Sequence, residues 1–171
     1  MPEIVKFLPQ RDVLSFEEIY RLVKTVAPLG VSKLRLTGGE PLVRKQLPVL
    51  VGMLKSVAGI EEVAMTTNAV LLAENALALK DAGLDRLNIS LDTVDRELFK
   101  TITRRDSLSE VLEGIEAAKH AGFDKIRINA VPLPTLGDEA LLDLARFCLR
   151  EKLELRFIEF MPLDGDQAWE K

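Results

Sequence analysis

Short strand-like segments alternate with helical segments along this chain, and the alternation limits the folds that it can adopt. Strands separated by helices at this spacing indicate parallel βαβ units. The expected fold class is therefore α/β: a partial, parallel βα barrel of about five strands with helices on its outside. We expect the strands at residues 31–37, 62–67, 86–91, 125–131 and 154–160. We expect the helices at residues 15–27, 47–57, 73–82, 95–102, 108–121 and 138–151.

Three of the expected strands are polar on one face and apolar on the other. Strand side chains alternate with a period of two, so Arg35, Ser90 and Arg127 each share a face with further polar residues. Parallel strands are usually apolar on both faces. The apolar face should pack under the helices, and the polar face should line a wet lumen or crevice that holds an anionic ligand. An open sheet with one solvated face is the alternative.

The composition argues against several classes of function. A net charge of −4 supplies no basic field for nucleic acid. No apolar run approaches the roughly 18 residues of a membrane span, and the first residues lack a secretory pattern, so we expect a cytoplasmic protein with no membrane partner. The single cysteine, Cys148, lies in an amphipathic helix and completes no metal site, so we assign no metal ligand.

The segment GGEP, Gly38–Pro41, directly follows the first expected strand. Glycines there allow positive φ angles and let the backbone approach a ligand closely. The carboxyl end of a parallel strand is where α/β folds bind ligands, and Glu40 can accept a hydrogen bond from an ammonium group. A tight turn without a ligand is the alternative interpretation.

Several motifs together resemble one enzyme family. The run KLRLTGGEPLVR is similar to the segment around the GGE motif of the radical S-adenosylmethionine (SAM) superfamily, in which GGE holds the methionine amino group of SAM. Within that superfamily the chain resembles the GTP 3′,8-cyclases of molybdenum cofactor biosynthesis along essentially its whole length. The further motifs are TTN (Thr66–Asn68), LNISLDTVD (Leu87–Asp95), ITRRD (Ile102–Asp106), INAV (Ile128–Val131) and LRFIEFMPL (Leu155–Leu163).

The resemblance implies a fold, a reaction and a set of site residues. The fold is the radical SAM type of partial βα barrel, and the reaction is a lyase-class rearrangement of GTP by a SAM-derived radical, the first step of molybdopterin synthesis. Arg127 takes the place of a family lysine, and Ala69 that of a family glycine. The residues implied for SAM are Gly38, Gly39, Glu40, Ser90 and Met161. Those implied for GTP are Arg35, Thr66 and Arg127.

Each implied role has a structural alternative. Arg35 and Arg127 could instead form ion pairs inside the protein, with Glu159 or Asp92 as partners. The Ser90 hydroxyl could bond only the backbone. Met161, in turn, could be a flexible core residue.

The cofactors of the family exceed what this chain can hold. The family uses two 4Fe–4S clusters, one held by a CxxxCxxC loop directly before the MPE sequence and one held by three cysteines beyond the barrel. The chain begins at MPE and has one cysteine. We therefore expect residues 1–171 to be an incomplete radical SAM core that lacks the first strand, both sets of cluster ligands and, on its own, activity.

Two classes of function remain open at this stage. The first is the core of a GTP cyclase, with GTP as substrate, SAM as cofactor, a homodimer as one expected assembly and the next enzyme of molybdopterin synthesis as its partner. The second is a non-catalytic, nucleotide-binding remnant of the same fold. A phosphate-handling barrel enzyme unrelated to SAM would need a cluster of histidines and carboxylates, which the sequence does not show.

Overall fold

The computed structural model describes residues 13–133 and 136–160. These residues form one five-stranded sheet in which every neighbouring pair of strands is parallel. The strands lie side by side in the order in which they occur in the chain. The strands are β1 (Lys33–Leu36), β2 (Glu62–Thr67), β3 (Arg86–Ser90), β4 (Ile126–Ala130) and β5 (Glu154–Phe157). All five expected strands are thus present, some of them shorter than predicted.

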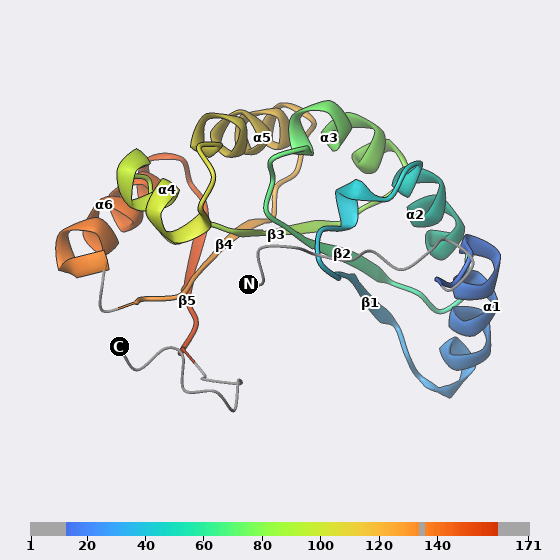
Figure 1. Ribbon diagram of the computed structural model, residues 1–171. Helices are drawn as coiled ribbons and strands as arrows, with labels where there is room; N and C mark the ends of the chain where they lie inside the picture. The colour runs from blue at the N-terminus through green and yellow to red at the C-terminus, as the bar shows by residue number, and fades with distance from the viewer. Residues whose placement is uncertain (1–12, 134–135, 161–171) are drawn as a thin grey trace.

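The helices cover one face of this sheet and follow its curvature, from α1 at one end to α6 at the other (Figure 1). A parallel sheet in chain order with helices on one side is part of a βα barrel, so the predicted fold class is confirmed. The helices are α1 (Phe16–Val26), α2 (Leu47–Lys55), α3 (Leu72–Asp81), α4 (Arg96–Thr103), α5 (Leu108–His120) and α6 (Gly137–Arg150). Two short 3-10 helices, η2 (Ala27–Leu29) and η3 (Pro41–Val43), were not predicted.

Local signals in the sequence explain where the first helix begins. The Ser15 side chain accepts a hydrogen bond from the Glu18 backbone N–H at 3.1 Å, and the Glu18 carboxylate accepts one from the Ser15 N–H at 2.8 Å. This reciprocal capping box satisfies two backbone donors that the first helical turn leaves unpaired. No helix in the described part of the chain is long and apolar enough to cross a membrane.

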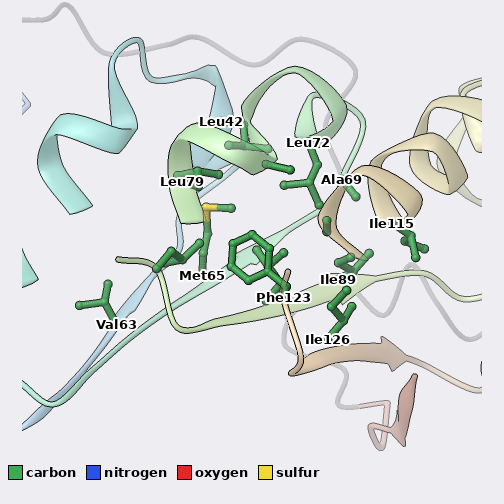
Figure 2. Close-up of a cluster of buried hydrophobic side chains, with 14 of the residues drawn as sticks. Leu42, Val63, Met65, Ala69, Leu72, Leu79, Ile89, Ile115, Phe123 and Ile126 are labelled. Atoms are coloured by element: carbon green, nitrogen blue, oxygen red, sulfur yellow. The ribbon is translucent and has the colours of Figure 1, made fainter. Parts of the chain in front are cut away.

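The core lies between the sheet and the helices. The apolar strand residues Val63, Met65, Ile89 and Ile126 point into it, where they meet side chains such as Leu72 (Figure 2). Most of these side chains are completely buried. Burial of apolar area at roughly 25 cal/mol per Å² supplies the main driving force for holding the helices on this face.

The other face of the sheet is polar, as the strand alternation predicts. Arg35 on β1 is in register with Ala64 on β2, and Ser90 on β3 is in register with Asn129 on β4. The middle of this face carries four polar side chains that neighbour one another across the strands, which we call the central polar row. The central polar row consists of Thr66, Asn88, Arg127 and Glu154.

The polar face is exposed in part and buried in part. Asn88 is only 1% exposed and Arg127 only 8% exposed, whereas Thr66 is half-buried and Glu154 is exposed, so only two residues of the central polar row are closed off from solvent. Ser90 and Arg35, by contrast, are exposed. A buried guanidinium needs a partner, and Arg127 has one in Glu154. The polar face therefore combines two buried polar residues with open groups nearer its ends.

The turn after β2 is packed against α5. Ala69 in this turn is completely buried and has a φ of 64°, which a non-glycine residue rarely adopts. Ala69, which takes the place of a family glycine, thus adopts a backbone conformation that glycine reaches more easily. Gly114 on α5 faces the Ala69 carbonyl oxygen so closely that a Cβ at position 114 would collide with it. The absence of a side chain at Gly114 is what allows α5 to support this turn.

Candidate functional site

The GGEP turn lies at the carboxyl end of β1 and leaves its backbone open. Gly38 has a φ of 154°, a conformation that side chains with a Cβ disfavour. A Cβ at Gly38 or at Gly39 would meet no atom within 4 Å, and both residues are exposed. This bare backbone leaves room for a ligand to approach, and the contact with SAM stays a prediction.

Glu40 ties the end of β1 to the end of β2. Its Oε1 atom accepts hydrogen bonds from the Leu42 N–H at 3.0 Å and from the Thr67 hydroxyl at 2.7 Å. Its Oε2 atom accepts a bond from the Asn68 N–H at 2.7 Å. Sequence reasoning considered only an ammonium partner for Glu40 and missed these donors. The carboxylate therefore has a structural role in the protein. Its Oε1 atom accepts from two donors of the described residues, whereas its Oε2 atom accepts from one.

Several hydroxyl and amide groups at the same edge have unused hydrogen-bonding capacity. The side chains of Thr66, Ser90 and Asn129 make no hydrogen bond to any residue of the described ranges, and Ser90 is exposed. The backbone-bonding alternative for Ser90 is thus not observed. Met161, the remaining expected SAM contact, lies outside the described residues.

Arg35 and Arg127 differ in their surroundings. Arg35 is exposed and pairs with no residue in the described part of the chain. The Nη2 atom of Arg127 donates to Glu154 at 2.8 Å, and its Nη1 atom lies 3.4 Å from the Asn88 amide oxygen. An ion pair was the alternative interpretation of Arg127, but the partners expected for it, Glu159 and Asp92, were wrong. Hydrogen bonding to Arg127 lowers the pKa of Glu154.

Asp92 joins the ends of β3 and β4. Its Oδ1 atom accepts a hydrogen bond from the Val131 N–H at 2.8 Å. Burial nevertheless raises the pKa of the Asp92 carboxyl, because the charged form loses its hydration and the Val131 bond offsets this loss only in part. The folded protein thus binds a proton at Asp92 more tightly than the unfolded chain does.

Replacement of Asp92 by asparagine should stabilise the protein at neutral pH. Asparagine still accepts from Val131 but carries no charge to desolvate. Below the ordinary carboxyl pKa of about 3.9 the wild-type side chain is protonated in both states, so the advantage should shrink as the pH falls. Urea unfolding between pH 7.5 and pH 4.5 measures this trend. Asp124→Asn, on an exposed loop, is the control, and an equal gain in both variants would contradict the assignment.

The lone cysteine does not fit an iron–sulfur site. Cys148 on α6 is 2% exposed, and burial raises the pKa of its thiol to about 11. It therefore stays protonated at neutral pH, whereas clusters are held by several thiolates. No group of three or more potential metal ligands occurs within residues 13–133 and 136–160.

A separate hollow at the amino ends of the strands is lined by charged side chains, two of which pair with each other. It has a volume of about 350 Å³, and Lys55, Asp85 and Lys125 contribute to its wall. Lys55 and Asp85 form an ion pair at 3.0 Å. Since α/β folds bind ligands at the carboxyl ends of their strands, the GGEP edge is the better candidate site.

A family model of the radical SAM superfamily matches residues 2–148, which is most of the chain. The chain belongs to the radical SAM superfamily. Members of this superfamily use SAM together with a 4Fe–4S cluster, so the superfamily implies both cofactors. Two solved structures have the same fold. Methylornithine synthase superimposes with a TM-score of 0.73 at 20% identity, over 89% of this chain and 46% of that one. SuiB of Streptococcus suis bound to S-adenosylmethionine gives 0.74 at 19% identity, over 91% of this chain and 36% of that one.

Curated relatives are more similar in sequence. The GTP 3′,8-cyclase of Rhodopirellula baltica is 48% identical over 171 residues, which cover 99% of this chain and 48% of that protein. The GTP 3′,8-cyclase of Streptomyces coelicolor is 45% identical over 176 residues, which cover 100% of this chain and 51% of that protein. The chain thus spans about half the length of the curated relatives that it matches.

The sequence contained signals for the residues that were missed. Glu154 and Arg156 alternate with Leu155 and Phe157, so the period of two places both charges on the polar face. Asn88 was placed on this face, but its burial depends on packing that the sequence does not display. The partners of Glu40 required the distance between two loops, which no local pattern provides.

Proposed function

We propose that this chain is the core of a GTP 3′,8-cyclase, which rearranges GTP in the first step of molybdenum cofactor biosynthesis. The observation that carries the proposal is the 42–48% identity to proteins of that name over nearly the whole chain. Polar groups at the carboxyl edge of the sheet that have no hydrogen-bond partner within residues 13–133 and 136–160 support it. We further propose that residues 1–171 are the radical SAM core of a longer protein.

We assign the SAM site to the edge formed by β1, β2 and β3. The open backbone of Gly38 and Gly39 would receive the methionine amino group, with Oε2 of Glu40 as a further acceptor. Ser90 offers an unused hydroxyl beside it, and Met161 completes the assignment from the family resemblance. SAM supplies the radical chemistry when it is bound, and the residues of this chain bind and orient it.

We assign the GTP site to Arg35, Thr66 and Arg127 on the polar face. Arg35 has a guanidinium without a partner among the described residues, and guanidinium geometry suits phosphate oxygens. Thr66 and Arg127 lie in the central polar row. Arginine at position 127 keeps the charge of the family lysine and can present two donors at once.

The cluster chemistry is assigned outside these residues. A 4Fe–4S cluster needs thiolates that Cys148 does not provide, so no reaction step is assigned to the clusters here. The presence of two clusters, a homodimeric assembly and a partnership with the next enzyme of molybdopterin synthesis remain predictions of the family resemblance. A cytoplasmic location remains a prediction from the sequence pattern.

Replacement of Arg35 by alanine tests the GTP assignment. The affinity for GTP should fall by about ten- to a hundredfold, because a charge-assisted hydrogen bond to phosphate contributes roughly 1.5–3 kcal/mol. The affinity for SAM should change much less. Equilibrium binding of both ligands measures the difference, with Arg21→Ala on the exposed side of α1 as the control for charge. Equal losses for GTP and SAM would indicate a structural role for Arg35.

A further inference from the structure

The central polar row contains a carboxylate where an anion is expected to bind. Glu154 on β5 is in register with Arg127 on β4. Its Oε2 atom accepts from Arg127 Nη2 at 2.8 Å, and its Oε1 atom accepts from Arg156 Nε at 3.1 Å. One glutamate therefore occupies donors of two arginines on the face that we assign to the phosphates of GTP.

Arg127 is held more firmly than its partner. Its side chain is 10% exposed, whereas that of Glu154 is 52% exposed. The Nε atom of Arg127 is buried and has no hydrogen-bond partner among the described residues. A buried donor without an acceptor is costly, so the site is incompletely satisfied as it stands. Of the two partners, the half-exposed carboxylate is the one that can move into solvent.

A phosphate that uses both donors of a guanidinium edge must compete with Glu154. Bidentate pairing requires two adjacent N–H groups, and Nη2 of Arg127 is already bonded to the glutamate. The net charge of the group also favours competition between Glu154 and a phosphate. Arg127 and Arg156 contribute +2 and Glu154 contributes −1, so this group carries +1 with the glutamate and would carry +2 without it.

We propose that Glu154 is an internal counter-ion that competes with the phosphates of GTP for Arg127 and Arg156, and so sets the affinity of the site for polyphosphate. This inference rests on the proposed function, because it takes the ligand of the polar face to be a nucleoside triphosphate. Glu154 lowers the affinity of the site and keeps Arg127 satisfied until a more highly charged ligand displaces it.

Binding of tripolyphosphate, GTP and guanosine to wild-type protein and to Glu154→Gln tests the proposal. The substitution keeps the size of the side chain and removes its charge. The affinity for tripolyphosphate should rise about three- to tenfold, a modest part of the value of a charge-assisted bond because Glu154 is half-exposed. GTP should gain by a similar factor, guanosine should not change, and the gain should shrink at high salt.

Two further variants make the result specific. Glu139→Gln removes the same charge from an exposed pair with Arg146 on α6, and it should change the affinity for tripolyphosphate less than twofold. Glu154→Asp keeps the charge but retracts it from Arg127, so it should give an intermediate gain. Thermal melting checks that each variant is folded.

The outcomes separate this inference from the proposed function. An unchanged or lower affinity of Glu154→Gln for tripolyphosphate, an equal gain in Glu139→Gln, or no binding of tripolyphosphate to any variant would overturn the competition. A gain for tripolyphosphate without any binding of GTP would support the competition and count against the GTP cyclase.

Discussion

Replacement of Gly114 by alanine should lower the free energy of unfolding by about 3 kcal/mol, the upper part of the range for overpacking a core. The new Cβ would lie well inside 3.0 Å of the Ala69 carbonyl oxygen and 3.1 Å from the Leu72 Cβ. The oxygen belongs to the backbone of Ala69, a completely buried residue, so it has little freedom to move aside. Urea unfolding of the two proteins measures the loss.

Gly52→Ala is the matched control for this substitution. Gly52 lies inside α2, and a Cβ there would meet no atom within 4 Å. Alanine favours the helix over glycine by about 1 kcal/mol, so Gly52→Ala should stabilise the protein. Opposite signs for two identical substitutions would show that the contact with Ala69 decides the outcome. If both substitutions stabilised the protein, the Ala69 carbonyl group would be free to move away from the new Cβ.

Replacement of Glu40 by alanine should destabilise the protein by about 2–4 kcal/mol, because Leu42, Thr67 and Asn68 all lose an acceptor. A buried donor without a partner costs about 1–3 kcal/mol, and water can serve the exposed one. The change corresponds to roughly 5–15 °C in the melting temperature for a chain of this size. Differential scanning calorimetry measures it.

Two further variants show whether the loss of stability in Glu40→Ala comes from the lost hydrogen bonds. Glu40→Gln retains one carbonyl oxygen, so it should lose only part of the stability. Glu113→Ala on the exposed side of α5 removes a carboxylate without a described partner and should change the melting temperature by little. If Glu40→Ala melted like the wild-type protein and lost only SAM binding, the carboxylate would serve the ligand alone.

The sequence predicts the fold well because its signals are local. The strand at 62–67 agrees with β2 at both ends, and α1, which the Ser15 capping box begins, lies within the helix expected at 15–27. The alternation of polar and apolar residues also assigns the two faces of the sheet. These patterns depend on residues a few positions apart, so they can be recognised in the sequence without knowledge of the fold.

The site is predicted less completely because its contacts are distant in sequence. Arg127 and Ser90 lie on the polar face as expected, yet the partner of Arg127 is Glu154, and Arg127 itself is buried. The donors that surround Glu40 come from the next strand. Register and loop packing decide such pairs, and neither follows from the spacing of residues along the chain.

The strand order of the sheet has a consequence for how the protein would respond to the nucleotide proposed above. Each strand pairs only with the strands that flank it in the chain, so no backbone hydrogen bond links β1 to β4 or β5 in the described ranges. Folding of such a sheet can proceed in steps of low contact order. A nucleotide lying across the face from Arg35 to Arg127 would supply the long-range contact that this topology lacks. The bound nucleotide would then hold together two parts of the sheet that no backbone hydrogen bond connects directly.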